Sequence, residues 1–224
     1  MRRLFTIITA LVTCLLSVPA IAHAAPMPLG SGTGLFNPAG TSSEQCTAAF
    51  AATDGVKGYL IAGPTCTGGT LYTSVNGKFV LVGTVVQQQS SFYNGFVVVE
   101  VTNTADWELV PWVPDGKNKI VLTGSKETPV GGKVCHASAT FPLRCGTVEA
   151  TGETAVFPWG KATGLTRTSI CSGSRDLGAA IVTDDQAQGI PLGGASDICT
   201  TSGTSYFVPI NPILNKFGLK LVTG

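Results

Sequence analysis

The stretch of the chain most suggestive of chemistry is residues 174–180, S-R-D-L-G-A-A, where an aspartate and a glycine flank a leucine. A serine in that place could act as a nucleophile, given an imidazole to take its proton and a carboxylate to orient the imidazole. The residue present is Leu177, a hydrocarbon that cannot attack a substrate. The stretch is therefore either the remnant of a catalytic loop or an ordinary turn.

Other residues that could carry chemistry are few. The chain has two histidines, of which His136 lies outside the N-terminal segment described below. Asp184 and Asp185 are adjacent, so their carboxylates point apart and we interpret them as a solvated turn. No C-x-x-C pair, phosphate-binding loop or calcium-binding loop occurs in the sequence. We therefore expect neither a metal site nor a cofactor.

The N-terminus has the pattern of a secretory signal peptide. A basic start is followed by an apolar run at residues 4–18, a proline and an A-H-A cleavage signature at 22–24. We expect residues 1–24 to be removed by cleavage after Ala24 and the mature chain to be secreted. The run is too short to span a bilayer comfortably, so we expect no integral membrane segment. Lipidation at Cys14 is an alternative, although the apolar run continues beyond that residue.

The cysteines agree with export. Of seven cysteines, Cys14 lies in the expected signal peptide, and an even number remains, which favours three disulfides. The remaining six are Cys46, Cys66, Cys135, Cys145, Cys171 and Cys199. The sequence alone does not choose among their pairings.

Charge is sparse and balanced along the chain. Charged residues make up 12% of the sequence, with 14 lysines and arginines against 13 aspartates and glutamates. This balance argues against a nucleic-acid partner or an anionic membrane surface. The abundance of Gly, Thr, Ser and Val is typical of an extracellular β protein.

The chain beyond residue 45 reads as short apolar strands separated by turns. We expect a first set of strands at 47–52, 58–62, 71–75, 78–87, 96–102 and 108–112. We expect a second set at 119–123, 132–138, 146–150, 166–169, 179–183, 187–192 and 206–209. Asn76-Gly77 predicts a type I′ hairpin. The one helical pattern, Ile210–Phe217, should end at Gly218.

These elements predict an all-β chain of two barrels or sandwiches with a short C-terminal helix. The polar stretch 114–119 is the expected domain boundary. We therefore assign 25–45 to an extended N-terminal segment rich in Pro, Gly and Ser. The N-terminal β-barrel is expected at 46–116, and the C-terminal β-barrel with the helix at 117–224.

Several ordered motifs resemble one known family, the bacterial chymotrypsin-like serine proteases of the α-lytic protease and streptogrisin type. I-A-G-P-T-C at 61–66 resembles the family's T-A-G-H-C, and A-D-W-E-L-V at 105–110 resembles the segment that carries the catalytic aspartate. S-R-D-L-G-A at 174–179 stands where G-D-S-G-G is found. V-C-H-A-S-A-T…R-C-G-T-V at 134–148 resembles a disulfide hairpin, and P-I-N-P-I-L-N-K-F-G-L-K-L-V at 209–222 the last helix and strand. The match covers the chain from about Cys46 to Val222.

The resemblance implies two six-stranded antiparallel β-barrels of the chymotrypsin-like fold with a short C-terminal helix. It also implies three disulfide pairs: Cys46–Cys66, Cys135–Cys145 and Cys171–Cys199. Q-G-I-P-L-G-G at 188–194 resembles the strand that lines the primary specificity pocket. Leu192, Gly193, Gly194 and Leu177 would then form a small apolar binding pocket, although we favour core filling as the role of Leu177.

The catalytic positions depart from the family pattern. The resemblance assigns the triad carboxylate to Asp106, the imidazole to Pro64 or Thr65, and the nucleophile to Leu177. Arg175 replaces a glycine whose amide would contribute to the oxyanion hole, and its side chain should disturb that backbone. Two of the three triad groups are absent, so the resemblance implies an inactive serine endopeptidase. Asp106 could alternatively be a structural residue that caps or hydrogen-bonds backbone amides beside Trp107.

Asp176 corresponds to a buried aspartate that needs a cation in the family. His136 occupies the position that is commonly arginine in bacterial relatives, so we expect protonated His136 to pair with Asp176. The alternative is an exposed histidine, with Asp176 meeting Arg175 or solvent.

Three functions are compatible with the sequence. The first is a secreted, non-catalytic homologue that binds a peptide or an extracellular protein. We expect this homologue to be a monomer. The second is a weak or non-standard serine hydrolase that uses a displaced hydroxyl, Ser172 or Ser174. The third is an exported domain with a purely structural role.

Overall fold

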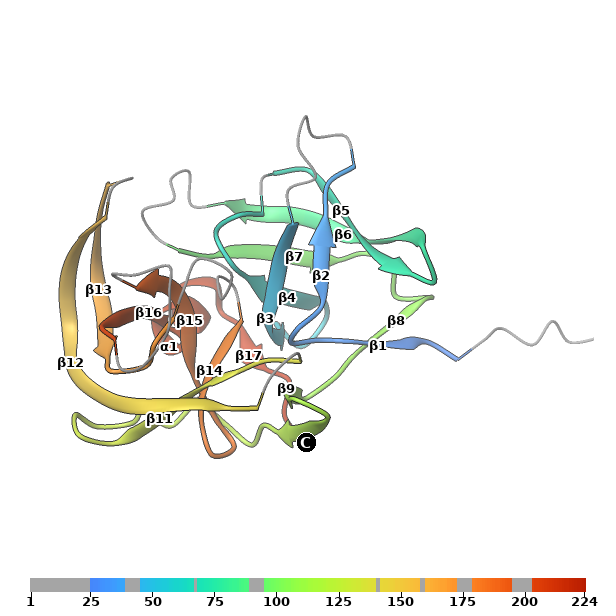
Figure 1. Ribbon diagram of the computed structural model, residues 1–224. Coiled ribbons are helices and arrows are strands. Elements are labelled where there is room, and N and C mark those ends of the chain that lie inside the picture. The colour runs from blue at the N-terminus through green and yellow to red at the C-terminus, as the bar shows by residue number, and fades with distance from the viewer. Residues whose placement is uncertain are drawn as a thin grey trace, which may run out of the picture.

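The computed structural model describes residues 25–38, 45–66, 68–88, 95–139, 142–157, 160–172, 179–194 and 203–224. Within these ranges the chain forms two antiparallel barrels side by side and one short helix packed on the second (Figure 1). The expected all-β, chymotrypsin-like double barrel is confirmed. No helix of the described part of the chain is long and apolar enough to cross a bilayer.

Six strands form the first barrel in the order β3-β2-β5-β6-β7-β4, and a β3–β4 pairing closes the ring. The strands are β2 (Gly34–Phe36), β3 (Gln45–Thr53), β4 (Gly58–Ala62), β5 (Thr70–Val75), β6 (Lys78–Gln88) and β7 (Val97–Val101). The interior holds fully buried side chains such as Leu60 and Val99. Asn76 and Gly77, with φ of 50° and 77°, turn β5 into β6, so the hairpin is confirmed.

The N-terminal segment belongs to this first barrel and does not form a separate lead-in. β2 pairs with β3 and β5, so the ring would be open without it. β1 (Met27–Leu29) runs parallel to β8 (Trp107–Leu109). Leu29 and Leu35 are completely buried. The expected start of the barrel at residue 46 is therefore wrong.

The second barrel is closed in the order β11-β12-β13-β16-β15-β14. Its strands are β11 (Lys133–Ala137), β12 (Arg144–Phe157), β13 (Gly160–Thr168), β14 (Ala180–Thr183), β15 (Gln186–Gly194) and β16 (Ser205–Pro209). The β12–β13 hairpin is longer than expected and curls beyond the ring (Figure 1). Residues 151–154 read T-G-E-T, and this polar stretch separates the expected strand at 146–150 from the apolar residues 155–157 that continue β12.

The C-terminal elements connect the two barrels. Helix α1 (Ile210–Phe217) forms as expected and ends at Gly218, whose φ of 63° is the left-handed conformation that glycine adopts at little cost. β17 (Lys220–Leu221) then returns to the first barrel and pairs with β3 at Thr53 and Ala52.

The expected boundary at 114–119 falls inside a hairpin. β9 (Trp112–Asp115) pairs with β10 (Asn118–Val121), and the polar residues form the turn between them. The chain crosses to the second barrel only after this hairpin, through residues 122–132. The polar residues 114–119 therefore predicted a turn, but the connection between the two barrels lies further along the chain.

Two glutamine side chains hold the crossing segment to the second barrel. Gln188 accepts a hydrogen bond from the Thr128 amide at 2.9 Å and donates to the Lys126 carbonyl at 2.8 Å. Gln186 accepts from the Lys126 amide at 3.0 Å. These amides replace the backbone ladder that a neighbouring strand would supply.

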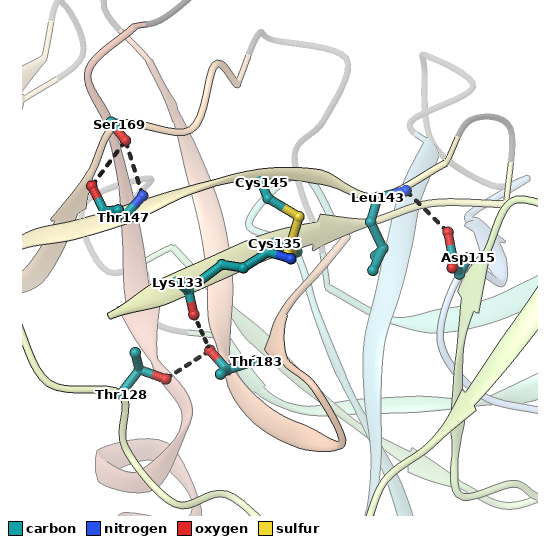
Figure 2. Close-up of a disulfide and its surroundings, with 9 residues drawn as sticks. All are labelled: Asp115, Thr128, Lys133, Cys135, Leu143, Cys145, Thr147, Ser169 and Thr183. Atoms are coloured by element: carbon teal, nitrogen blue, oxygen red, sulfur yellow. Dashed lines mark hydrogen bonds between the residues drawn. A yellow bond between two sulfur atoms is a disulfide. The ribbon is translucent and has the colours of Figure 1, made fainter. Parts of the chain in front are cut away.

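Hydroxyl groups continue the attachment toward the Cys135–Cys145 disulfide (Figure 2). The Thr128 hydroxyl donates to the Thr183 hydroxyl at 2.6 Å, which in turn donates to the Lys133 carbonyl at 2.8 Å. The crossing segment is thereby tied to both β11 and β14.

We predict that Gln188→Met lowers the free energy of unfolding by about 2 kcal/mol. Methionine fills the buried space but leaves the Thr128 amide and the Lys126 carbonyl without their partner. Urea denaturation measures the change, with Val156→Ala as a control because Val156 is 81% exposed. Equal stability of Gln188→Met and Val156→Ala would contradict the attachment described above.

A second prediction concerns the contribution of Asp185 to stability at low pH. Hydrogen bonds from the Thr123 hydroxyl and the Gln186 amide hold the pKa of Asp185 below its ordinary value of 3.8. A lowered pKa in the folded state stabilises the protein above the unfolded pKa, and this contribution is lost as the pH falls through the folded pKa. Asp185→Asn should therefore lower the urea midpoint at about pH 6 and leave it nearly unchanged at about pH 2. An equal loss at both pH values would contradict this assignment.

Candidate functional site

The register of β4 and β7 decides which residues can meet at the predicted catalytic position. Ala62 at the end of β4 pairs with Val97 at the start of β7, and Gly58 pairs with Val101 at the other end. Pro64 and Thr65 follow β4, whereas Gly95 and Phe96 precede β7. These two short segments therefore lie at the same end of the strand pair.

The assignment of Asp106 to the triad is wrong. Asp106 follows Val101, at the far end of β7 from Thr65, and β7 alone spans about 13 Å. A triad carboxylate must lie within hydrogen-bond distance of the imidazole. The strand register gives the corresponding place to Gly95, directly before β7.

Asp106 has a structural role, but the hydrogen bond described for its carboxylate comes from a side-chain amide and not from the backbone amides that the alternative interpretation expected. It is exposed, and its carboxylate accepts a hydrogen bond from the Asn103 side-chain amide at 2.8 Å. Its own backbone amide donates to the Asn103 side-chain oxygen at 3.3 Å, and its carbonyl accepts from the Met27 amide at 2.7 Å. Asp106 thus shapes the turn that leads into β8.

Gly95 has no room for a carboxylate. It is buried, with φ of 68°, and a Cβ atom there would lie 2.1 Å from Leu192 Cδ2 and 2.8 Å from Val208 Cγ2. Contacts this short do not occur between real side chains, so the neighbouring leucine fills the space. The position next to the imidazole site is therefore apolar and closed.

A β-bulge aims Leu192 at this space. The pairing of β15 with β16 shifts between Pro191 and Gly193, which leaves Leu192 as the extra residue. Bulges of this kind redirect a side chain. Leu192 is 4% exposed and packs with Leu165. It is a buried packing residue, contrary to its expected place in a binding pocket.

The edge of β15 near Gly193 and Gly194 is paired on one side. β16 covers that side, through Tyr206 and Ser205. The pairing with β14 ends at Gly189, so within the described residues the other edge beyond Gly189 has no strand beside it.

Two of the expected disulfides are confirmed, Cys46–Cys66 and Cys135–Cys145. The first fixes the Pro64–Thr65 turn to β3. The second joins directly opposed residues of β11 and β12 (Figure 2). Cys171 is disulfide-bonded, and its expected partner Cys199 lies outside the described residues.

His136 is the one imidazole in the described part of the chain, and it is 1% exposed. It lies on β11 of the second barrel, opposite Ile181 of β14 and Arg144 of β12. The alternative of an exposed histidine is therefore wrong. Arg175, Asp176 and Leu177 lie outside the described residues, so the expected pairing of His136 with Asp176 stays a prediction.

The hydroxyl of Ser172 is poorly placed for a nucleophile. Ser172 is 3% exposed, and its Oγ has no hydrogen-bond partner among the described residues. Ser174 lies outside the described residues. Among the described residues no group of three His, Cys, Asp or Glu side chains could hold a metal ion.

The sequence interpretation missed Gly95 and Phe96. The signal was present in the chain, because in an antiparallel pair the start of one strand lies beside the end of the other, and residues 95–96 precede the strand that pairs with β4. Asn94-Gly95 stands in that position before an unbroken apolar run, V-V-V at 97–99.

Comparison with known proteins finds bacterial serine proteases. Streptogrisin-C from Streptomyces griseus is 35% identical over 184 residues, which cover 81% of this chain and 39% of that protein. Serine protease 1 from Rarobacter faecitabidus is 32% identical over 192 residues, covering 83% and 34% respectively. The chain thus spans well under half the length of these relatives. No protein-family model matches it.

Solved structures agree with these relatives. Thermobifida fusca protease A is 30% identical with a TM-score of 0.72, and the match covers 88% of this chain and 100% of that one. An α-lytic protease homologue, N4, is 31% identical with a TM-score of 0.73, covering 87% and 99%.

We predict that Gly95→Asp lowers the free energy of unfolding by about 3 kcal/mol or more, because it places an unpaired carboxylate against Leu192. Leu192→Ser opens the space and should reduce this cost, so the double variant should be more stable than the sum of the single effects predicts, by about 1 kcal/mol. Urea denaturation of all three variants measures the coupling.

Gly164→Asp is the matched control. Gly164 has a similar φ of 72°, but a Cβ there meets nothing within 4 Å. It therefore carries the same backbone strain without the contact. Additive effects of Gly95→Asp and Leu192→Ser would contradict the packing described above.

Proposed function

The chain belongs to the bacterial chymotrypsin-like serine proteases of the α-lytic protease and streptogrisin type, and we propose that it is an exported member without catalysis that binds a peptide or protein. The observation that carries the proposal is the Gly95–Leu192 contact, which fills the place of a triad carboxylate with hydrocarbon.

All three catalytic groups are missing in this proposal. The turn after β4 offers Pro64 and Thr65, neither of which can take a proton from a nucleophile. Gly95 has no carboxylate, and the sequence has Leu177 in place of serine. Loss of the serine or the histidine alone costs a serine protease about 10⁶ in kcat, or about 8 kcal/mol. Any hydrolysis that substrate binding alone still promotes should therefore be very slow.

The β15 edge supports binding as the remaining activity. Beyond Gly189 the strand is paired on one side within the described residues, and it ends in two glycines, which carry no side chain. An extended peptide can add to such an edge through main-chain hydrogen bonds. Loss of the catalytic groups does not remove this edge.

Export remains part of the proposal. Disulfides persist in oxidising compartments, and the chain has two described pairs together with a bonded Cys171. The N-terminal pattern of residues 1–24 accounts for delivery to such a compartment. Cleavage after Ala24 would leave β1 close to the new N-terminus.

A displaced-serine hydrolase is the alternative function. It requires a base next to Ser172 or Ser174, and His136 is buried in the second barrel. A purely structural role is the other alternative, and specific capture of an extended peptide would argue against it.

The test is hydrolysis of peptide anilides and esters by the purified mature chain. We expect no turnover above the rate without protein. Turnover that disappears in Ser172→Ala or Ser174→Ala would overturn the proposal, because a contaminating protease would survive both substitutions.

Peptide binding is tested separately, by titrating extended peptides and following the amide signals of Gly193 and Gly194. We expect chemical-shift changes confined to β15 and its neighbours. Gly193→Pro removes a backbone donor and should weaken binding about tenfold if that donor is used. Equal binding by this variant would place the peptide elsewhere.

A further inference from the structure

The two described disulfides differ in how far solvent can reach them. Cys46 and Cys66 are 2% and 1% exposed and lie in the core of the first barrel. Cys135 on β11 is 4% exposed, but its partner Cys145 on β12 is exposed. A disulfide opens when a thiolate reaches one of its two sulfur atoms. In the folded protein, a thiolate can therefore approach the second bond from the side of Cys145.

The residues beside Cys145 leave this approach open. Cys135 and Cys145 are directly opposed, and the next pair on the same face of the two strands is Lys133 and Thr147. Both residues of that pair are exposed. The Thr147 hydroxyl shares a hydrogen bond of 3.2 Å with the Ser169 hydroxyl, and Figure 2 shows it directed toward Ser169. This side of the bond is therefore bordered by a short hydroxyl side chain and a flexible lysine.

The other cysteine of the bond lines a cavity of about 710 Å³ beside the crossing segment. Four charged side chains line the same cavity, two of each sign: Lys126, Lys133, Glu127 and Asp184. All four are exposed. A thiolate next to such a wall is solvated, whereas a thiolate released among apolar side chains alone would be desolvated. The cavity thus lowers the cost of releasing Cys135 as a thiolate.

The two strands have other contacts that keep them paired when the bond is open. β11 and β12 are in register from Lys133 and Thr147 to His136 and Arg144, and β11 also pairs with β14 on its other side. The bond spans a sequence separation of 10, against 20 for the disulfide of the first barrel, so it restricts the unfolded chain less. The fold should therefore survive opening of the bond, with the two thiols still opposite each other.

We propose that Cys145 is a thiol-exchange site, at which a small-molecule thiol forms a mixed disulfide with the folded protein. The thiolate of the small molecule attacks Cys145 Sγ and forms a new S–S bond to it. The bond between Cys145 and Cys135 breaks, and Cys135 leaves as a thiolate that takes a proton from water. This site is separate from the β15 edge and does not depend on the proposed function.

The mixed disulfide has two further reactions. Attack of the Cys135 thiolate on Cys145 Sγ restores the original bond and releases the small thiol. Attack of a second small thiolate on the small-molecule sulfur releases Cys145 as a thiolate and forms one small-molecule disulfide. In the second reaction the protein gains two electrons, which come from the two small thiols. The state of the cysteine pair therefore follows the ratio of small thiol to small disulfide around the protein.

Opening of the bond should loosen the turn between β11 and β12. This turn is held to the β9–β10 hairpin by a hydrogen bond of 3.0 Å from the Leu143 amide to Asp115 Oδ1. A second hydrogen bond, of 2.8 Å, runs from the Gly116 amide to the Ser138 carbonyl. Figure 2 shows the disulfide next to Leu143 at the base of the turn. Exchange of the Leu143 amide with solvent therefore reports whether the bond is closed.

The experiment exposes the mature chain to 2-mercaptoethanol for increasing times, stops the reaction with acid and locates the modified cysteines by peptide mass mapping. We expect the mixed disulfide on Cys145, formed about a hundredfold faster than any modification of Cys46 or Cys66. In concentrated urea the two bonds should react at similar rates, because unfolding removes the difference in access. Equal rates in the folded protein, a first reaction at Cys171, or a mixed disulfide on Cys135 would overturn the proposal.

A variant that carries both Cys135→Ser and Cys145→Ser is the matched control. It should fold, and its Leu143 amide should exchange with deuterium about as fast as that of the reduced wild-type protein. The amide of Leu60, a completely buried residue of the first barrel, should stay protected in both proteins. Loss of protection at Leu60 on reduction would mean that the bond opens by unfolding, and would overturn the proposal. Unchanged exchange at Leu143 in both proteins would contradict the loosening of the turn.

Discussion

The two barrels meet over one apolar cluster, in which Phe50 and Ile61 of the first barrel share a core with Val182 and Ile190 of the second. Ile210 and the rest of the buried face of α1 belong to the same cluster. Burial of one such side chain stabilises the folded state by about 1.5–3 kcal/mol. This shared core fixes the barrels relative to each other, and with them every group that lies between β7 and β15.

The packing between Gly95 and Leu192 follows from that fixed geometry. The barrels cannot move apart to admit a group between Gly95 and Leu192, so the side chains on the two sides must share one volume. Leu192 occupies the space that a side chain at position 95 would need, so position 95 is a glycine. Restoring a carboxylate therefore involves both barrels, and a single substitution cannot recover the family's arrangement.

Local sequence signals predicted the elements they determine directly. Asn76-Gly77 specified a turn because both residues accept positive φ, and Ile210–Phe217 showed one helical face with a glycine after it. The resemblance supplied the disulfide pairs, which spacing could not. Asp106 was assigned by a short motif alone, and the motif does not contain the strand register that separates Asp106 from Thr65. The Leu192 bulge likewise depends on two strands, so no single stretch of sequence reveals it.

The pairing of β17 with β3 has a consequence for the order of assembly. Thr53 and Ala52 acquire this neighbour only when Lys220 and Leu221 have been synthesised. A nascent chain that has completed the first ring still carries an uncovered backbone segment on β3, which can pair with other chains. Such long-range closure is slow compared with hairpin formation. The edge of β3 at Ala52 and Thr53 is therefore covered only after the segment that follows α1 has folded back onto it.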